Sequence, residues 1–506
     1  MNQNPILVPA IHSIGGTINS SPGPQSRGFG AIACCLLLVL AGCPTADTGP
    51  GQQPVNRPLE GVKLRLLVVD DPALATAIGR LRGEWNAQTG ADLQVEQASE
   101  KQLEGVESLP ADAVLCASHL LGPLAERGLV APVPQRQLRS SQWADVFELP
   151  KLREAAWGTE VKAVPFGSPV LICYYRADLL EKLGRRPPQT WADYQELAKL
   201  LSDSPEKPSD GGAWCGTIEP LAPGWAGLVF LARAAPYAKH RDNYSTLFNI
   251  DTMEPLLATP PMIRALEELV AAAKSGPADP FAFDPAAVRA AFWRGQCGMA
   301  LTWPTAAAFS NEPFSRDPKG SVNKKIRVGF AELPGSRKVF NLGSRAWDTR
   351  TDEEDPHVPL LAIAGRLGLV GAKSPHCEAA FELLAWLSDS QNSLQASTAS
   401  PVTTLFRHSH LSAPGPWVEK PVPAPLADQY AMMTEATLRR EQWLGALRLP
   451  GRAEYLAALD EAVRSAVRGE KPPVKALLQA EAQWKKITER LGVERQRAAY
   501  LHSLGL

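Results

Sequence analysis

The stretch "VKLRLLVVDD", residues 62–71, is a continuous apolar run that ends in two carboxylates. A run without alternation is typical of a β-strand buried on both faces of a sheet. Apolar side chains then recur at spacings of four, three and four over residues 73–88, which predicts an amphipathic helix. The stretches "DLQVEQA" and "DAVLCASH" predict two more strands, with the helix "LLGPLAERG" after them. This alternation predicts an α/β fold with a parallel, doubly wound sheet.

Polar side chains follow the first and third of these strands. In open α/β sheets, ligands bind beyond the carboxyl ends of the strands. We therefore expect Asp70, Asp71, Ser118 and His119 at one edge of the sheet, as ligand contacts. Asp70 or Asp71 could instead cap the helix that follows, which would be a structural role.

Composition limits the class of partner. The 506 residues are 45% hydrophobic and 21% charged, enough for two or three compact units. Lys+Arg number 52 against 53 Asp+Glu, and no long run has one sign of charge. A polyanion would need a basic surface, so we expect no nucleic-acid partner.

The apolar run "AIACCLLLVLAGC", residues 31–43, is too short for a permanent membrane span and ends in small residues. Residues 40–43 resemble the lipobox of exported bacterial lipoproteins, which implies a signal peptide over 1–42 and acylation of Cys43. Residues 43–61, rich in Pro, Gly and Gln, predict a flexible tether. The alternative is an ordinary signal peptide with a chance cysteine. Only Arg27 supplies a positive charge before the run, fewer than such segments usually carry.

The remaining cysteines are 116, 173, 215, 297 and 377, an odd number at irregular spacings. This pattern fits neither a disulfide framework nor a zinc site, so we expect buried thiols with at most one or two bridges. His408 and His410 have no acidic or thiol partners at ligand spacing. We expect no metal and no cofactor.

Four stretches carry a resemblance to a known family: residues 112–133, 164–201, 292–309 and 455–484. In this order they resemble the family-1 extracellular solute-binding proteins of ABC importers, which include maltose-type sugar binders. The resemblance covers nearly all of the mature chain. It implies two α/β lobes, each a mostly parallel sheet flanked by helices, joined by crossing hinge segments. Lobe 1 would hold residues 62–164 and 345–405, and lobe 2 residues 165–344 and 406–506.

The resemblance also implies a function. A lipoprotein of this family would capture a small solute, a sugar or oligosaccharide, in the cleft between its lobes. Closure around the solute would let the ABC permease subunits, with their ATPase, recognise the loaded form. We expect an exported monomer, held to the membrane by its lipid and facing the periplasm or exterior.

A sugar site needs converging polar groups beside aromatic rings. Matching the family's motifs places further ligand contacts after later strands, at the hinge and near a C-terminal helix. These further candidates are Ser168, Glu219, Trp225, Trp303, Thr305, Asn341, Arg345, Trp347, Arg448 and Tyr455. Trp85, Trp293, Trp386 and Trp484 lie on amphipathic helix faces and are expected in the core. In "RRPPQTW", residues 185–191, we expect Thr190 to cap a helix and Trp191 to pack beneath the turn.

Two alternatives to import stay open. One is a sensor lipoprotein that uses the same cleft to report its ligand. The other is an enzyme acting on carbohydrate, for which the sequence gives no support: GxSxG, HExxH and Walker motifs are missing. The paired acids, Asp70 with Asp71 and Glu353 with Glu354, are sequence neighbours rather than a spaced catalytic pair.

Overall fold

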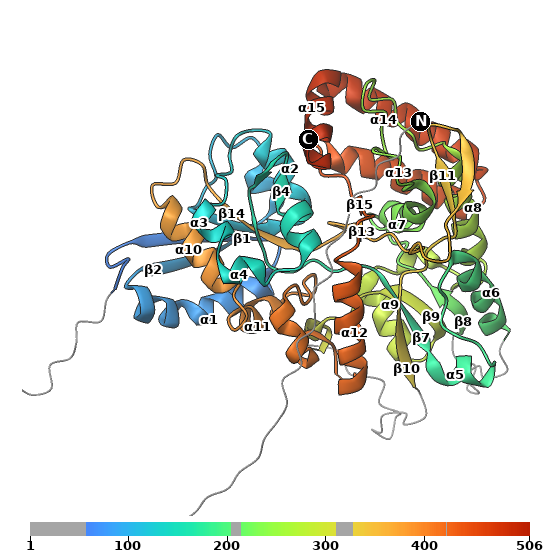
Figure 1. Cartoon of the computed structure of the whole chain (residues 1–506), viewed down its shortest axis with the longest axis horizontal. Coiled ribbons are helices and arrows are strands. Elements are labelled where there is room, and N and C mark those ends of the chain that lie inside the picture. Colours follow the sequence, from blue (N-terminus) through green and yellow to red (C-terminus); the bar gives the residue numbers. More distant parts are fainter. Residues whose placement is uncertain (1–56, 204–213, 310–326, 421) are drawn as a thin grey trace, which may run out of the picture. The chain divides into compact units, whose positions relative to one another are not determined.

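The computed structural model describes residues 57–203, 214–309, 327–420 and 422–506 (Figure 1). The expected signal peptide, the lipidation site Cys43 and most of the tether lie outside these ranges. Within them, no helix combines the length and apolar character that crossing a membrane requires.

The first sheet has the strand order β2-β1-β3-β14-β6. Its strands are β1 (Lys63–Val69), β2 (Asp92–Ala98), β3 (Ala113–Ala117), β6 (Val164–Pro165) and β14 (Arg366–Val370). Strand β1 lies between β2 and β3 and pairs in parallel with both, with Leu66 opposite Val95 on one side and Ala113 on the other. The sequence prediction for these three strands is therefore confirmed.

Helix α1 (Pro72–Thr89) shows how the sequence builds the first layer. Asp71 caps it by accepting from the Leu74 amide, Pro72 opens its first turn, and Gly90 ends it at φ 80°. Its buried face packs on the sheet, and the Trp85 ring lies 5.3 Å from Trp386 of α10 (Cys377–Leu387). Smaller elements complete this part of the chain: η1 (Glu100–Leu103), η2 (Ser118–Leu120), α2 (Leu121–Ala125), α3 (Gln135–Leu138), α4 (Ser141–Ala144), η3 (Pro150–Glu154), β4 (Ala156–Trp157), β5 (Glu160–Val161) and α11 (Ser393–Ala396).

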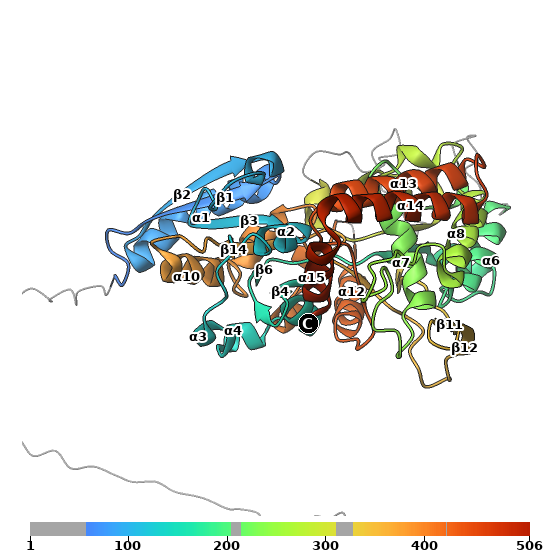
Figure 2. The same ribbon diagram turned by 90° about the horizontal axis from the view of Figure 1, so that it is seen from above.

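The second sheet has the order β10-β7-β9-β8. Its strands are β7 (Ile172–Arg176), β8 (Cys215–Ile218), β9 (Cys297–Thr302) and β10 (Val328–Glu332). Around it lie α5 (Ala177–Lys182), α6 (Trp191–Ser202), α7 (Ala226–Ala238), α8 (Pro260–Ala273), α9 (Pro285–Trp293), α12 (Ala424–Thr437), α13 (Arg452–Val467) and α14 (Pro473–Leu491). Figure 2 shows α13 and α14 side by side over α7 and α8.

Both sheets are mixed, which corrects the expectation of mostly parallel sheets. β14 is antiparallel to β3 and β6, and β7 is antiparallel to β9 and β10. The reversed strands are β14 in the first sheet and β7 in the second, and each lies next to a segment that passes from one sheet to the other. These passages lie at residues 165–172 and 361–366 and between α11 and α12. Beside them, β13 (Leu360–Leu361) pairs in parallel with β15 (Leu444–Gly445).

The proline-bearing joint before α6 has the structure expected for it. The Thr190 hydroxyl accepts a hydrogen bond from the Asp193 amide, and the Asp193 carboxylate accepts one from the Thr190 amide. Together the two bonds form a capping box. Trp191 is 1% exposed, and the guanidinium carbon of Arg233 lies 3.9 Å from its ring centroid. The joint is therefore a packing element, as predicted.

Four cysteines lie buried within the strands of the two sheets: Cys116 on β3, Cys173 on β7, Cys215 on β8 and Cys297 on β9. All four, together with the half-buried Cys377, are free thiols. The prediction of buried thiols is confirmed for the four strand positions.

Two further elements complete the fold. The hairpin β11 (Lys338–Asn341) and β12 (Ala346–Thr349) stands apart from the second sheet. Helix α15 (Val493–Leu504) follows α14, and the Tyr500 hydroxyl lies 2.7 Å from the Ser245 hydroxyl. At its end, the His502 carbonyl accepts from the Gly158 amide in the turn between β4 and β5.

Candidate functional site

Asp71 is the centre of a buried polar cluster at the carboxyl end of β1. Its carboxylate accepts from the Arg366 guanidinium at 3.0 Å and from the Ser400 hydroxyl at 2.6 Å, besides capping α1. The pair with Arg366 is almost wholly shielded from solvent. All of the contacts of Asp71 are thus with the protein itself, and the capping role is one that the sequence had left open.

Asp70, in contrast, points to the surface. Its backbone has φ 49°, an uncommon conformation for a residue other than glycine. Its carboxylate accepts from the Glu100 amide at 3.0 Å, and its carbonyl accepts from Arg366. The exposed carboxylate therefore keeps acceptor capacity for a ligand.

Ser118 and His119 follow β3 at the same edge of the sheet. The Ser118 hydroxyl is buried and, among the described residues, has no hydrogen-bond partner. His119 Nε2 lies 3.3 Å from a Glu100 carboxylate oxygen. Burial lowers the pKa of His119 despite this bond, while the hydrogen bond from His119 lowers the pKa of Glu100. The positive charge of Arg452, at the start of α13, contributes to both shifts. We call Asp70, Glu100, Ser118 and His119 the rim cluster.

A pair of tryptophans lies at the ends of elements from the second sheet. The rings of Trp225, just before α7, and Trp303, just after β9, have centroids 5.7 Å apart. Trp303 is buried and donates from Nε1 to the Pro401 carbonyl at 3.0 Å, whereas Trp225 is partly exposed. Thr305 is buried beside them, with its amide bonded to the Glu419 carboxylate.

The segment at Ser400 and Pro401 joins these two groups. Ser400 donates to Asp71, and its carbonyl accepts from the Thr305 hydroxyl at 3.4 Å. Pro401 accepts from Trp303. The structure thus brings together side chains from both sheets that the sequence had named separately.

Ser168 and Arg448 meet at a second cluster, where the chain crosses between the sheets. Ser168 donates to the Ala364 carbonyl at 2.9 Å, and Arg448 donates to the Glu154 carbonyl at 2.7 Å. The Glu154 carboxylate is buried and accepts from the Ala362 amide. Burial raises the pKa of Glu154 and lowers the pKa of Arg448 to about 10.

Two further predicted contacts, Glu219 just after β8 and Tyr455 on α13, are buried. Glu219 is 6% exposed and accepts from Arg233 at 2.6 Å. Tyr455 is 0% exposed and its hydroxyl lies 2.8 Å from that of Thr488, within the core formed by α13 and α14.

The other three predicted contacts lie together on the hairpin. The Asn341 side chain closes the turn by accepting from the amides of residues 343 and 344, and Arg345 is exposed at φ 54°. Trp347 is 36% exposed, 5.3 Å from the Phe340 ring. Over the described ranges, no hydrogen bond, ion pair or ring contact joins the hairpin to Asp71 or Trp303.

Sequence reasoning missed Glu100, Arg366, Ser400 and Arg452. Glu100, Arg366 and Ser400 lie outside the sequence motifs, and each is placed by a bond to a residue at least 19 positions away. Arg452 lies between two predicted contacts, Arg448 and Tyr455, and its charge acts on Glu100. A signal for Arg366 exists only in hindsight: it follows Gly365, whose φ of 108° marks a sharp change of direction.

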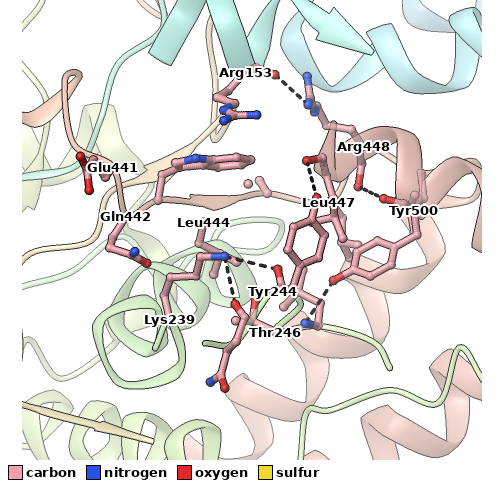
Figure 3. A pocket seen from close by; sticks show the side chains of 18 of the residues that line it. Arg153, Lys239, Tyr244, Thr246, Glu441, Gln442, Leu444, Leu447, Arg448 and Tyr500 are labelled. Atoms are coloured by element: carbon pink, nitrogen blue, oxygen red, sulfur yellow. Dashed lines mark hydrogen bonds between the residues drawn. The ribbon is translucent and has the colours of Figure 1, made fainter. Parts of the chain in front are cut away.

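A cavity of about 210 Å³ lies beside β15 (Figure 3). Its walls come from β15 and the residues after it, the 239–247 loop, Arg153 and the end of α15. Of the predicted contacts, only Arg448 lines it. A second cavity of about 640 Å³ shares Lys239, Arg241, Glu441 and Gln442 with the first. Over the described residues, no group of three or more His, Cys, Asp or Glu is placed to hold a metal ion.

The chain matches the family of bacterial extracellular solute-binding proteins over residues 83–393. It belongs to this family. The resemblance inferred from the sequence is therefore confirmed.

Solved structures of the same kind share the fold. A solute-binding protein of an ABC transporter from Agrobacterium radiobacter K84, in complex with ribitol, is 19% identical, with a TM-score of 0.60 over 85% of this chain and 100% of that one. Maltose-bound MalE3 of T. maritima is 16% identical, with a TM-score of 0.60 over 84% and 100%. A protein from Agrobacterium vitis S4 with bound D-mannitol is 18% identical, with a TM-score of 0.57 over 85% and 99%. The two-lobed α/β fold is that of periplasmic solute-binding proteins, as predicted.

Proposed function

We propose that the chain captures a sugar, an oligosaccharide or a related polyol between its two lobes and delivers it to an ABC importer. The solute-binding part of this proposal follows from the family to which the chain belongs. The ribitol, maltose and mannitol bound to the three similar structures support the solute class. The proposed role is binding without chemistry, since the family is one of substrate-binding proteins.

One observation supports this solute class most directly: the partly exposed Trp225 lies against Trp303, and the Ser400–Pro401 segment connects this pair to Asp71 beside the rim cluster. An indole face suits the C–H face of a sugar ring. Carboxylate and imidazole groups suit its hydroxyls. Asp70, Glu100 and His119 supply such groups.

Within the predicted set, we propose a division of roles. The proposed ligand contacts are Asp70, Ser118, His119 and Trp225, with Glu100 and Arg452 added. The proposed positioning residues are Asp71, Ser168, Glu219, Trp303, Thr305, Arg448 and Tyr455, because protein groups already occupy their polar atoms. Asn341, Arg345 and Trp347 belong to the hairpin, and we do not assign them to the same site.

The proposed lobes follow the two sheets. Lobe 1 takes residues 62–164 and lobe 2 begins at 165. The return to lobe 1 is proposed at about 362 rather than at 345, because residue 345 lies inside the paired β11–β12 hairpin. Lobe 2 resumes after about 405. Closure of such lobes on a solute that contacts both is the proposed signal to the permease.

Attachment and export are proposed from the sequence alone. We propose that the chain is a monomer, that it is acylated on Cys43, and that it faces the periplasm or exterior. The ABC permease is its proposed partner; a sensor lipoprotein would use the same binding step. Solute uptake by cells that lack the chain separates these roles, because loss of uptake fits import and unchanged uptake with a lost response fits sensing.

A thermal-shift screen against monosaccharides, oligosaccharides and polyols tests the proposal. A solute at 100 times its dissociation constant should stabilise the fold by about 2.7 kcal/mol. Trp225→Ala should abolish the shift, whereas Trp347→Ala, which removes an equally large ring from the hairpin, should keep it. A shift that survives Trp225→Ala and disappears with Trp347→Ala would place the sugar at the hairpin. If no sugar or polyol gives a shift, the proposed solute class is wrong.

A further inference from the structure

The cavity beside β15, the β15 cavity, is a candidate for a second site. Its volume of about 210 Å³ is well above the roughly 10–15 Å³ that a single water needs on this measure. None of the rim cluster and neither member of the tryptophan pair lines it. Whatever it holds is therefore separate from the proposed sugar.

The lining of the β15 cavity is strongly basic. It includes Arg153, Lys239, Arg241 and Arg448 but only one acid, Glu441, although the whole chain has a formal net charge of −1. Two of these cations are already engaged. Arg448 donates to the carbonyls of Arg153 and Glu154, and Arg241 lies 3.5 Å from the Glu354 carboxylate. Lys239 is bonded through two of its three N–H groups, and the Arg153 guanidinium forms no hydrogen bond or ion pair within the described ranges.

Arg153 is exposed, and within the described ranges its guanidinium forms no hydrogen bond or ion pair. Its guanidinium carbon lies 5.3 Å from the centroid of the Trp443 ring, which also lines the cavity. A guanidinium resting on an indole face loses little side-chain freedom when it binds an anion. The donors of Arg153 are thus oriented and unused.

Lys239 approaches from another wall. Its ammonium donates to the carbonyls of Asn243 and Tyr244 at 3.2 and 3.3 Å. An ammonium has three donors, so one is left. Burial lowers the pKa of Lys239, and the positive charge of Arg153 lowers it further. In the view of Figure 3, Arg153 lies at the top, Lys239 at the bottom and Glu441 at the left of the lining side chains.

We propose that the β15 cavity binds a small oxyanion, a carboxylate or phosphate group, between Arg153 and Lys239. The guanidinium donates a pair of hydrogen bonds to two oxygens, and the ammonium donates its third N–H. Trp443 supports the body of the molecule, and Glu441 stays at the edge of the cavity. This proposal goes beyond sugar capture and does not depend on it.

Titration calorimetry of the purified chain with sodium phosphate, and separately with sodium citrate, tests the proposal. Sodium chloride at equal ionic strength serves as the blank. We expect saturable binding of at least one anion. Arg153→Gln and Lys239→Gln should each weaken it about tenfold or more, because each removes a hydrogen bond between two charged groups. Arg80→Gln removes the same charge from an exposed position on α1 and should leave binding unchanged.

The results separate specific binding from general charge attraction. Binding of phosphate alone, or of citrate alone, identifies the group that the site takes. Saturable binding that Arg80→Gln weakens as much as Arg153→Gln, or no saturable binding of either anion, overturns the proposal. Arg153 is exposed, so Arg153→Gln should melt at the parent temperature without anion, and its solute response in the sugar screen should be intact.

Discussion

The buried pair of Glu219 and Arg233 offers the sharpest test of the division between ligand contacts and positioning residues. Arg233 is 0% exposed, and its guanidinium lies against Trp191 and Tyr194. Within the part of the chain that the structure describes, its anionic partner is Glu219, at 2.6 Å. Glu219→Gln keeps the shape of the side chain but leaves a buried cation without a counter-charge.

Breaking a buried pair by removing one partner costs about 3–5 kcal/mol. The amide oxygen of glutamine still accepts from Arg233, so we expect a value near the lower end, about 3 kcal/mol. Replacing both partners removes both charges and is often close to neutral. The double variant Glu219→Gln/Arg233→Met should therefore recover most of the lost stability, since the methionine side chain can still pack on Trp191.

Urea unfolding of the single and double variants measures these terms as a double-mutant cycle. Solute binding is measured on the same samples. Recovery of stability in the double variant supports a positioning role for Glu219. If Glu219→Gln changes the free energy of unfolding by less than about 1 kcal/mol while abolishing solute binding, then Glu219 contacts the ligand. The assignment would then be reversed.

Two further predictions concern the first lobe and acid stability. Asp71→Ala should lower the free energy of unfolding in urea by about 3–5 kcal/mol, because it leaves Arg366 buried without its carboxylate. Asp70→Ala should lower it by less than about 1 kcal/mol and should weaken solute binding instead. Equal stability losses in the two variants would contradict the assigned roles. Burial lowers the pKa of His410 from 6.5 to about 3. Between these pH values the unfolded state binds a proton on His410 that the folded state does not bind. The free energy of unfolding should therefore fall by about 1.4 kcal/mol per pH unit as the pH drops through this window. His410→Gln should flatten this part of the acid-unfolding curve, and an unchanged slope would count against a neutral buried imidazole.

The local periodicity of the sequence predicted the elements of the fold well. The helix expected over residues 73–88 is α1 at Pro72–Thr89, and the strands around it follow the apolar runs. The direction of β14 was not predictable in this way. Its pairing with β3 joins residues about 250 positions apart, and local periodicity carries no information about a partner at that distance.

The candidate site shows the same limit at the level of single side chains. Asp70 and Asp71 are neighbours just after β1, and the sequence pattern alone did not tell which of them faces inward. Which one does so is set by Arg366, which lies 295 residues away in the sequence. Trp303 shows a related effect: the sequence predicted it as a ligand contact, but its ring is buried and its N–H donates to the Pro401 carbonyl, a partner 98 residues away.

The buried thiols in the strands can be used to measure how often each lobe unfolds. Burial raises the pKa of Cys116 and Cys215 to about 12 and moves those of Cys173 and Cys297 upward as well. Only the thiolate attacks alkylating reagents or disulfides, so these sulfurs stay inert while the strands remain paired. Cys116 reports on one lobe and the other three on the second, so the rate at which each becomes labelled ranks the two halves by how often each unfolds.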